Sequence, residues 1–171
     1  MNTRPRQLWT CAAIALLLMG CGSRPVTKIE DVVQDIKFKN RTRGEKQLAD
    51  AATAAHDLGC SARSGALVRV DSHEVLPARP VPGRDVNQRL VISACGVGDN
   101  AVGTLTRRVS FQGRTLFEDS ERYTLKPGRW MIDVFIGVPP QAAPGPYHID
   151  VKFDRRGASF SSTDNFTVVA R

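Results

Sequence analysis

The chain has 171 residues, of which 42% are hydrophobic and 24% charged, with a formal net charge of +7. These values lie in the normal range for a globular protein and predict one folded domain, with a core of ordinary size that needs neither a metal nor several disulfides. The positive charge favours anionic surfaces such as phospholipid head groups, lipopolysaccharide or acidic wall polymers.

The first twenty residues have the three parts of an export signal. Arg4 and Arg6 form a positively charged start, and the apolar run LWTCAAIALLLM follows over residues 8–19. This run is too short to span a bilayer. Residues 18–21 read LMGC, which resembles the lipobox of bacterial lipoproteins, with Cys21 as its cysteine. The resemblance implies that the Cys21 thiol receives a diacylglyceryl group, that the signal is cut before it, and that fatty chains then anchor the protein.

Two alternatives to this interpretation stay open, namely an ordinary secretory signal with a chance cysteine and an uncleaved anchor helix. For a lipoprotein, the net charge falls to about +5 after cleavage, because Arg4 and Arg6 leave with the signal. No Asp follows Cys21 directly, and by family resemblance this favours the outer membrane, facing the periplasm. The expected partners are the membrane, through the lipid, and another envelope protein, while export makes nucleic acid an improbable partner.

The number of cysteines also fits a location in the cell envelope. Cys11 leaves with the signal and Cys21 carries lipid, so Cys60 and Cys95 remain as a pair. In an oxidising envelope they would close a loop of about 36 residues, worth roughly 3 to 4 kcal/mol in the chain-entropy model. The alternative is two separate buried thiols. A zinc site is not predicted, because the sequence has no CxxC motif and no nearby pair of histidines.

The mature chain is predicted to begin with two helices. The apolar residues of the first recur at helical spacing, at Ile29, Val32, Val33 and Ile36. Thr27 and Glu30 fit a capping box at its start. The second is predicted over residues 45–58, with a mostly alanine apolar side, and Gly59 is placed to end it.

Between the predicted helices lies the basic segment KFKNRTRGEK. Lys37, Lys39, Arg41 and Arg43 could contact an anionic membrane surface, at about 1 kcal/mol for each well-placed charge. The alternative is a solvated linker between the anchor and the domain. Residues 21–62 are therefore predicted to be a lipidated tether with helical segments, following the signal peptide at 1–20.

From about residue 66 the pattern changes to short alternating runs separated by Gly, Pro, Asn and Asp, which is typical of an all-β domain. Arg107 interrupts the apolar face of the third run, and Gln112-Gly113 suits a tight hairpin after it. The predicted strands are residues 66–70, 89–95, 104–111, 114–119, 122–126, 129–138, 146–153 and 165–170.

Seven or eight strands over residues 63–171 favour an antiparallel sandwich of two sheets. The segment PPQAAPGPYHIDVKFD and the final F-x-V strand resemble the closing part of immunoglobulin-like, fibronectin-like and macroglobulin-like envelope domains. This resemblance covers about 40 residues from Trp130 onward. It implies a mainly β, immunoglobulin-like sandwich preceded by a short helical segment, and it carries no site residues with it.

Catalytic motifs are absent from the sequence. The three histidines are widely spaced without an HxH or HExxH pattern, and there is no G-x-S-x-G elbow, P-loop or dinucleotide-binding turn. Asp71, His73 and Glu74 form a compact polar cluster that could bind a metal or act as acid and base, the alternative being solvated turn positions. No enzyme activity, cofactor or metal site is therefore predicted.

The strand at 129–138 supplies a candidate interaction surface. Met131 and Phe135 lie on the face opposite Trp130 and Ile132 and would form an apolar patch if that face is open. The alternative is that a loop or the helices predicted within 28–58 cover them.

The sequence as a whole predicts a membrane-anchored envelope lipoprotein whose sandwich acts as a non-enzymatic protein-interaction or assembly module. A module that binds cell wall or glycan is the alternative. A hydrolase would need a clustered nucleophile and base, which the sequence does not show.

Overall fold

The computed structural model describes residues 40–61, 65–98 and 101–170, with side chains from Gly44 onward. The lipobox with Cys21, the first predicted helix with Ile29 to Ile36, Lys37 and Lys39 lie outside the described residues. The described elements are β1 (Asn40–Ala49), α2 (Ala51–Leu58), β2 (Leu67–Leu76), β3 (Asp85–Cys95), β4 (Ala101–Phe111), β5 (Arg114–Leu125), β6 (Gly128–Gly137), β7 (Gly145–Arg155) and β8 (Ala158–Val168).

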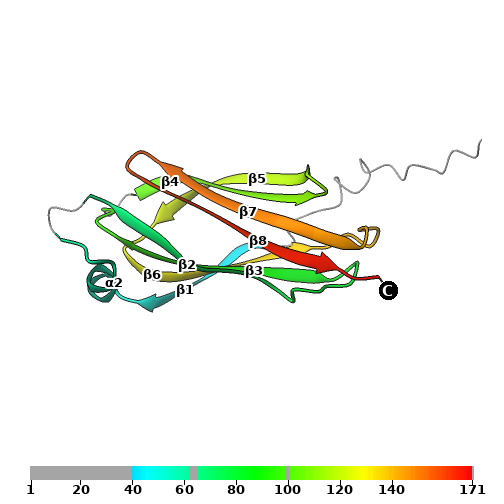
Figure 1. The fold of residues 1–171 in the computed structure, drawn as a ribbon. Helices are drawn as coiled ribbons and strands as arrows, with labels where there is room; N and C mark the ends of the chain where they lie inside the picture. Colours follow the sequence, from blue (N-terminus) through cyan, green and yellow to red (C-terminus); the bar gives the residue numbers. More distant parts are fainter. Residues whose placement is uncertain (1–39, 62–64, 99–100, 171) are drawn as a thin grey trace, which may run out of the picture.

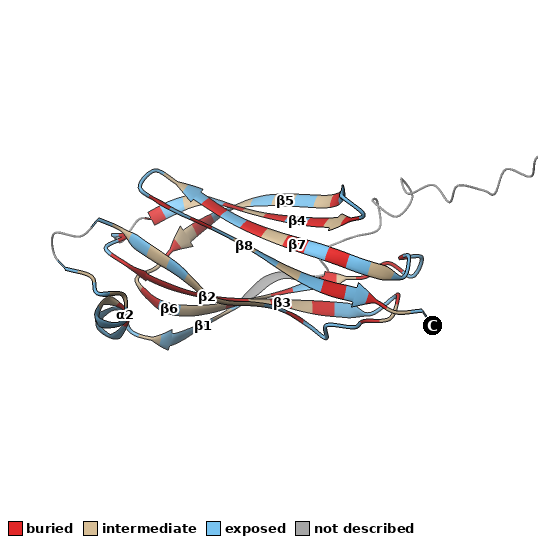
Figure 2. Ribbon diagram, in the orientation of Figure 1, coloured by how far each residue is buried: buried red, intermediate tan, exposed pale blue. Residues whose placement is uncertain are grey.

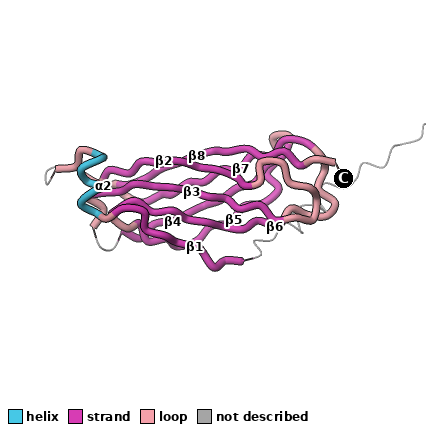
Figure 3. Tube along the Cα trace, turned by 90° about the horizontal axis from the view of Figure 1, so that it is seen from below, coloured by secondary structure: helices cyan, strands magenta, loops and turns pink. Residues whose placement is uncertain are grey.

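The strands form two antiparallel sheets that pack face to face (Figure 1). Sheet A has the strand order β1-β6-β3-β2, and sheet B has the order β5-β4-β7-β8. The sandwich is elongated along the strands, with α2 at one end and the last residues of the chain at the other (Figure 3). The prediction of a mainly β protein built from antiparallel sheets is confirmed.

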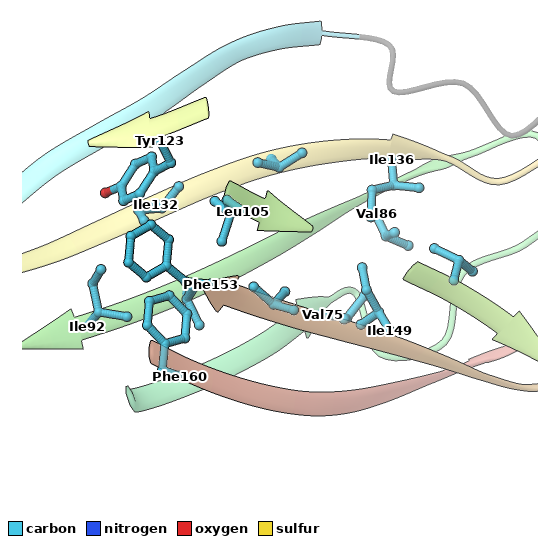
Figure 4. Close-up of a cluster of buried hydrophobic side chains, with 14 of the residues drawn as sticks. Val75, Val86, Ile92, Leu105, Tyr123, Ile132, Ile136, Ile149, Phe153 and Phe160 are labelled. Carbon is cyan, nitrogen blue, oxygen red and sulfur yellow. The ribbon is translucent and has the colours of Figure 1, made fainter. Parts of the chain in front are cut away.

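The core follows from the alternation of side chains along each strand. In β7, buried residues alternate with exposed or partly exposed ones, as the banding of Figure 2 shows. The inward side chains of both sheets form one apolar cluster (Figure 4). At one end of it, Tyr123 meets Phe153 edge to face with ring centroids 6.0 Å apart, and Phe153 stacks on Phe160 at 5.5 Å.

The helix predicted over residues 45–58 is wrong in its first part, because residues 45–49 belong to β1. There Lys46 pairs with Met131 and Gln47 with Trp130, so strand pairing with β6 outweighs the helical spacing of the apolar residues. Helix α2 starts only after Asp50, whose carboxylate accepts a hydrogen bond from the Thr53 amide at 2.8 Å.

The predicted end of this helix is confirmed. Gly59 adopts a left-handed conformation, with φ of 67°, and its amide bonds back to the last turn. Ala54 is the one buried residue of α2, so the helix packs shallowly. No helix within the described ranges is long and apolar enough to cross a membrane.

The folded unit begins earlier than the boundary predicted at residue 63. Because β1 is a strand of sheet A and α2 contacts β3 and β6, part of the predicted tether belongs to the sandwich. Several strands are also longer than predicted. β2 continues to Leu76, β8 starts at Ala158, and the two segments predicted at 114–119 and 122–126 form the single strand β5.

Candidate functional site

A bulge in β2 decides where the polar residues of this strand lie. Val70 pairs with Ile92 and Ser72 with Val91, so Asp71 is an extra residue in the ladder. The extra residue reverses the alternation beyond it. As a result His73 and Val75 face the interior, whereas without the bulge they would face outward.

His73 belongs to a chain of hydrogen bonds that crosses the interior of the sandwich. The guanidinium of Arg107 donates to a carboxylate oxygen of Glu121 through Nη1, and to Oε1 of Gln88 through Nε at 3.1 Å. Nε2 of Gln88 lies 3.0 Å from Nε2 of His73, and Nδ1 of His73 lies 3.2 Å from Oγ of Ser162. We call these five residues the polar chain, and each comes from a different strand.

The middle of the polar chain is deeply buried, with 4% of Arg107 and 1% of Gln88 exposed. A buried guanidinium is tolerated only when acceptors surround it, and here Glu121 and Gln88 supply them. The chain is therefore a satisfied polar network inside an otherwise apolar core.

The donors and acceptors of the polar chain determine which nitrogen of the neutral His73 ring carries the proton. Arg107 can only donate, so the Gln88 amide must turn its oxygen toward Arg107 and its NH₂ group toward His73. Nε2 of His73 then accepts a hydrogen bond, and the ring proton sits on Nδ1, from which it is donated to Ser162. Burial lowers the pKa of His73 and Arg107 acts in the same direction, while Asp164 and Asp150 oppose them.

This arrangement does not activate Ser162 as a nucleophile. Activation needs an unprotonated ring nitrogen that faces the hydroxyl, and Nδ1 carries the proton instead. The contact between Ser162 and His73 is thus a brace between β8 and β2 and not a catalytic pair.

The polar cluster predicted from the sequence, Asp71, His73 and Glu74, is divided between the inner and outer faces of sheet A. Asp71 lies on the outer face of sheet A, where it accepts a hydrogen bond from Ser93 at 2.5 Å and forms ion pairs with Arg69 and Arg129. Burial would raise the pKa of Asp71, but the hydrogen bonds from Ser93 and Arg69 and the charges of Arg69 and Arg129 hold it below its usual value. Glu74 is exposed, and no group of three potential metal ligands occurs among the described residues.

The outer face of sheet A carries the predicted interaction residues. Phe135 is 45% exposed, whereas Met131 is only partly exposed. Asp133 lies between them on β6 and binds Arg89 and Asn87, each at 3.0 Å. Helix α2 lies beyond the opposite end of β6 from Phe135, so it does not cover this side chain.

The outer face of sheet B is mostly polar, with Val102 as an exposed apolar residue. Arg108 binds Glu118 at 2.7 Å, and Thr163 donates to Asp150 at 2.6 Å. A shallow groove crosses all four strands here, which we call the polar groove. It is lined by Thr106, Arg108, Glu118, Asp150, Val151, Lys152, Ser161, Ser162 and Thr163.

The remaining predicted residues lie near the ends of β1 and α2. Cys60 and Cys95 are at disulfide distance, with Cα atoms 6.5 Å apart, and they join the end of α2 to the end of β3. Arg41 and Arg43 lie in β1, but their side chains are outside the described part.

Sequence reasoning recognised Arg107 as an interruption but missed Gln88 and Glu121. Gln88 lies one position before the predicted strand at 89–95. Extending the alternation back from Leu90 would have placed its amide in the core, so a signal for it was present.

No protein-family model matches the chain, and no curated protein sequence matches it. Spo0M, a sporulation control protein from Bacillus subtilis, is 16% identical with a TM-score of 0.41, over 63% of this chain and 51% of that chain. The Parabacteroides merdae beta-glucuronidase is 9% identical with a TM-score of 0.43, over 59% of this chain and 14% of that chain. The Pseudomonas fluorescens alkylpurine DNA glycosylase AlkC is 13% identical with a TM-score of 0.42, over 59% of this chain and 30% of that chain.

This chain thus spans about half of Spo0M and smaller shares of the other two proteins. With TM-scores this low, the likenesses carry no argument about what the chain does.

Proposed function

We propose that the chain is an envelope protein anchored by lipid at Cys21, and that its sandwich acts as a non-enzymatic protein-interaction or assembly module. Two features support the location. The first is the export signal that ends at Cys21, and the second is the cysteine pair at disulfide distance, which suits an oxidising compartment. We further propose the outer membrane, facing the periplasm, as the site of anchoring.

We also propose that the sandwich is immunoglobulin-like. If β2 to β8 are taken as its seven strands, the first, second and fifth share one sheet, and the third, sixth and seventh share the other. The fourth strand, β5, joins the third, and β1 is an addition. In support, the Tyr147 hydroxyl at the start of β7 donates to the carbonyl of Ala143 at 3.0 Å, which is the arrangement of a tyrosine corner.

The observation that carries the interaction function is the exposure of Phe135. A large aromatic side chain that is 45% exposed on a sheet face leaves apolar area in water that a partner could bury. Asp133 and Arg89 beside it would supply a polar rim.

The anchor is tested by Cys21→Ser. We expect this variant to move from the membrane to the soluble fraction while its sandwich stays folded, because the lipid is attached outside the described fold. Fractionation with circular dichroism of the soluble protein measures both. Retention of the variant in the membrane, or an unmodified Met1 in mass spectra of the native protein, would refute the anchor.

The interaction surface is tested by placing a photo-crosslinking amino acid at position 135 in cells. We expect a discrete cross-linked protein from Phe135, and none from Val102, an apolar residue of sheet B that is 38% exposed. Phe135→Ser should weaken co-purification of that cross-linked protein, and Val102→Ser should not. Equal cross-linking from both positions would count against the surface.

The alternative function, binding of glycan or wall polymer, is favoured by the polar groove. Its hydroxyl groups and ion pairs could hydrogen-bond to sugar hydroxyls. Sedimentation with purified peptidoglycan distinguishes this function, since Arg108→Ser should then reduce binding while Phe135→Ser leaves it unchanged.

A further inference from the structure

One long side of the sandwich is closed by contacts between β2 and β8, which are edge strands of different sheets. The Val75 amide donates to Oδ2 of Asp164 at 2.8 Å, and His73 contacts Ser162. Just beyond β2, two backbone bonds continue the contact, from the Thr167 amide to Ala78 and from the Val169 amide to Pro80. We call these contacts the β2–β8 seam.

We propose that His73 is a pH-sensitive switch that holds the β2–β8 seam closed while its imidazole is neutral and loosens it when the ring takes up a proton. The proposal follows from the hydrogen-bond directions of the polar chain and does not depend on where the protein is located.

A second ring proton would have to sit on Nε2, which faces the NH₂ group of Gln88 at 3.0 Å. Two donors would then point at each other in a buried place. Rotating the Gln88 amide does not help, because its NH₂ group would then face the Nε–H of Arg107 at 3.1 Å. Arg107 cannot give up its proton, so the second ring proton, on Nε2, has no acceptor within the polar chain.

The charges around His73 show how the ring would respond. Asp164 on β8 and Asp150 on β7 favour the charged ring, whereas Arg107 on β4 and burial disfavour it. Glu121 on β5 is engaged by Arg107, and Glu74, next to His73 on β2, is exposed. The nearest compensating charge therefore lies on β8, at the carboxylate of Asp164. To reach that carboxylate, the ring has to break its hydrogen bond with Gln88. This movement loosens the contact between β2 and β8.

Hydrogen exchange at the seam tests the switch. In the wild-type chain, the protection of the Val75, Thr167 and Val169 amides, corrected for intrinsic exchange, should fall about tenfold between about pH 7.5 and 5.5. Amides in the central pairing of β4 with β7 should keep their protection, since they lie away from the seam. Unchanged protection at the seam would overturn the proposal.

Variants separate His73 from other titrating groups. His73→Gln cannot be protonated, so its seam amides should show no pH dependence over this interval, even if they are less protected throughout. His148→Gln, which removes an exposed histidine on the outer face of sheet B, should behave as the wild type does. Persistence of the pH dependence in His73→Gln would refute the proposal.

Nitrogen NMR of the unmodified chain provides a test that needs no variant. At neutral pH the His73 ring should be the neutral tautomer with its proton on Nδ1. A proton on Nε2 at neutral pH would contradict the hydrogen-bond directions and thus the switch.

Discussion

Arg107 is a charged residue buried in the apolar core. Its guanidinium is almost fully buried between the sheets, and Glu121 and Gln88 accept its hydrogen bonds. Replacing a buried pair with apolar groups can be neutral, but removing one partner strands the other in a medium that solvates it poorly. The polar chain is therefore sensitive to the loss of any single member.

We predict that Arg107→Met lowers the free energy of unfolding by about 3 kcal/mol, because Glu121 and Gln88 lose their donor. The neighbouring Arg108→Met serves as the control. Arg108 pairs with Glu118 on the outer face, where both side chains are about half exposed, so its loss should cost less than about 1 kcal/mol. Urea unfolding monitored by fluorescence measures both, and equal costs would contradict the role of Arg107.

The sequence shows that Arg107 interrupts the apolar face of its strand, but it does not indicate which residues accept hydrogen bonds from the guanidinium. Gln88 and Glu121 lie on other strands, and their distance from Arg107 depends on how the sheets are paired and stacked. The same holds for Asp71 and His73, which are close in sequence but separated by the bulge. Cys60 and Cys95 are different, since the sequence already predicts them as a pair once Cys11 and Cys21 are assigned to the expected signal and lipid anchor.

At the scale of elements, strands whose apolar and polar residues alternate strongly, such as β6 and β7, can be predicted from sequence. The alternation arises because one face of each strand is buried. β1 is not predictable in this way. Its segment contains alanine and leucine at helical spacing, and only pairing with β6 makes it a strand. Asp50 marks the true start of α2 and is a capping signal that the periodicity concealed.

The pairing of β4 with β7 includes a close approach that glycine permits. A Cβ atom on Gly103 would lie 2.5 Å from Cζ of Phe153 and 2.7 Å from the carbonyl oxygen of Asp154. We predict that Gly103→Ala destabilises the fold by about 3 kcal/mol through overpacking. Gly65→Ala, whose Cβ would meet no atom within 4 Å, should be nearly neutral in the same thermal unfolding experiment. A neutral Gly103→Ala would show that β4 and β7 can separate freely.

At the scale of the whole molecule, one long side of the sandwich is braced by the β2–β8 seam, and the α2 end is tied by the cysteine pair. Cys60 lies just after α2, and Cys95 is the last residue of β3. A bond here joins a shallowly packed helix to the end of β3, a central strand of sheet A.

We predict that the double variant Cys60→Ala/Cys95→Ala loses roughly 3 to 4 kcal/mol of stability in the chain-entropy model, because the unfolded chain regains the freedom of a closed loop. Chemical unfolding measures this loss. The wild type in excess reductant should show the same loss, and reductant should leave the double variant unchanged. A wild type that ignores reductant would indicate that the two thiols are not bonded.

The orientation of β1 has a mechanical consequence. This strand runs from Asn40, opposite Phe135, to Ala49, opposite Arg129, so the chain upstream joins β1 at the end of the sandwich away from α2. Hydrogen bonds of an antiparallel pair lie across the strands. Tension applied along β1 from its upstream end would therefore act on all the hydrogen bonds between β1 and β6 at once, in shear. It would not break them one by one, as peeling does.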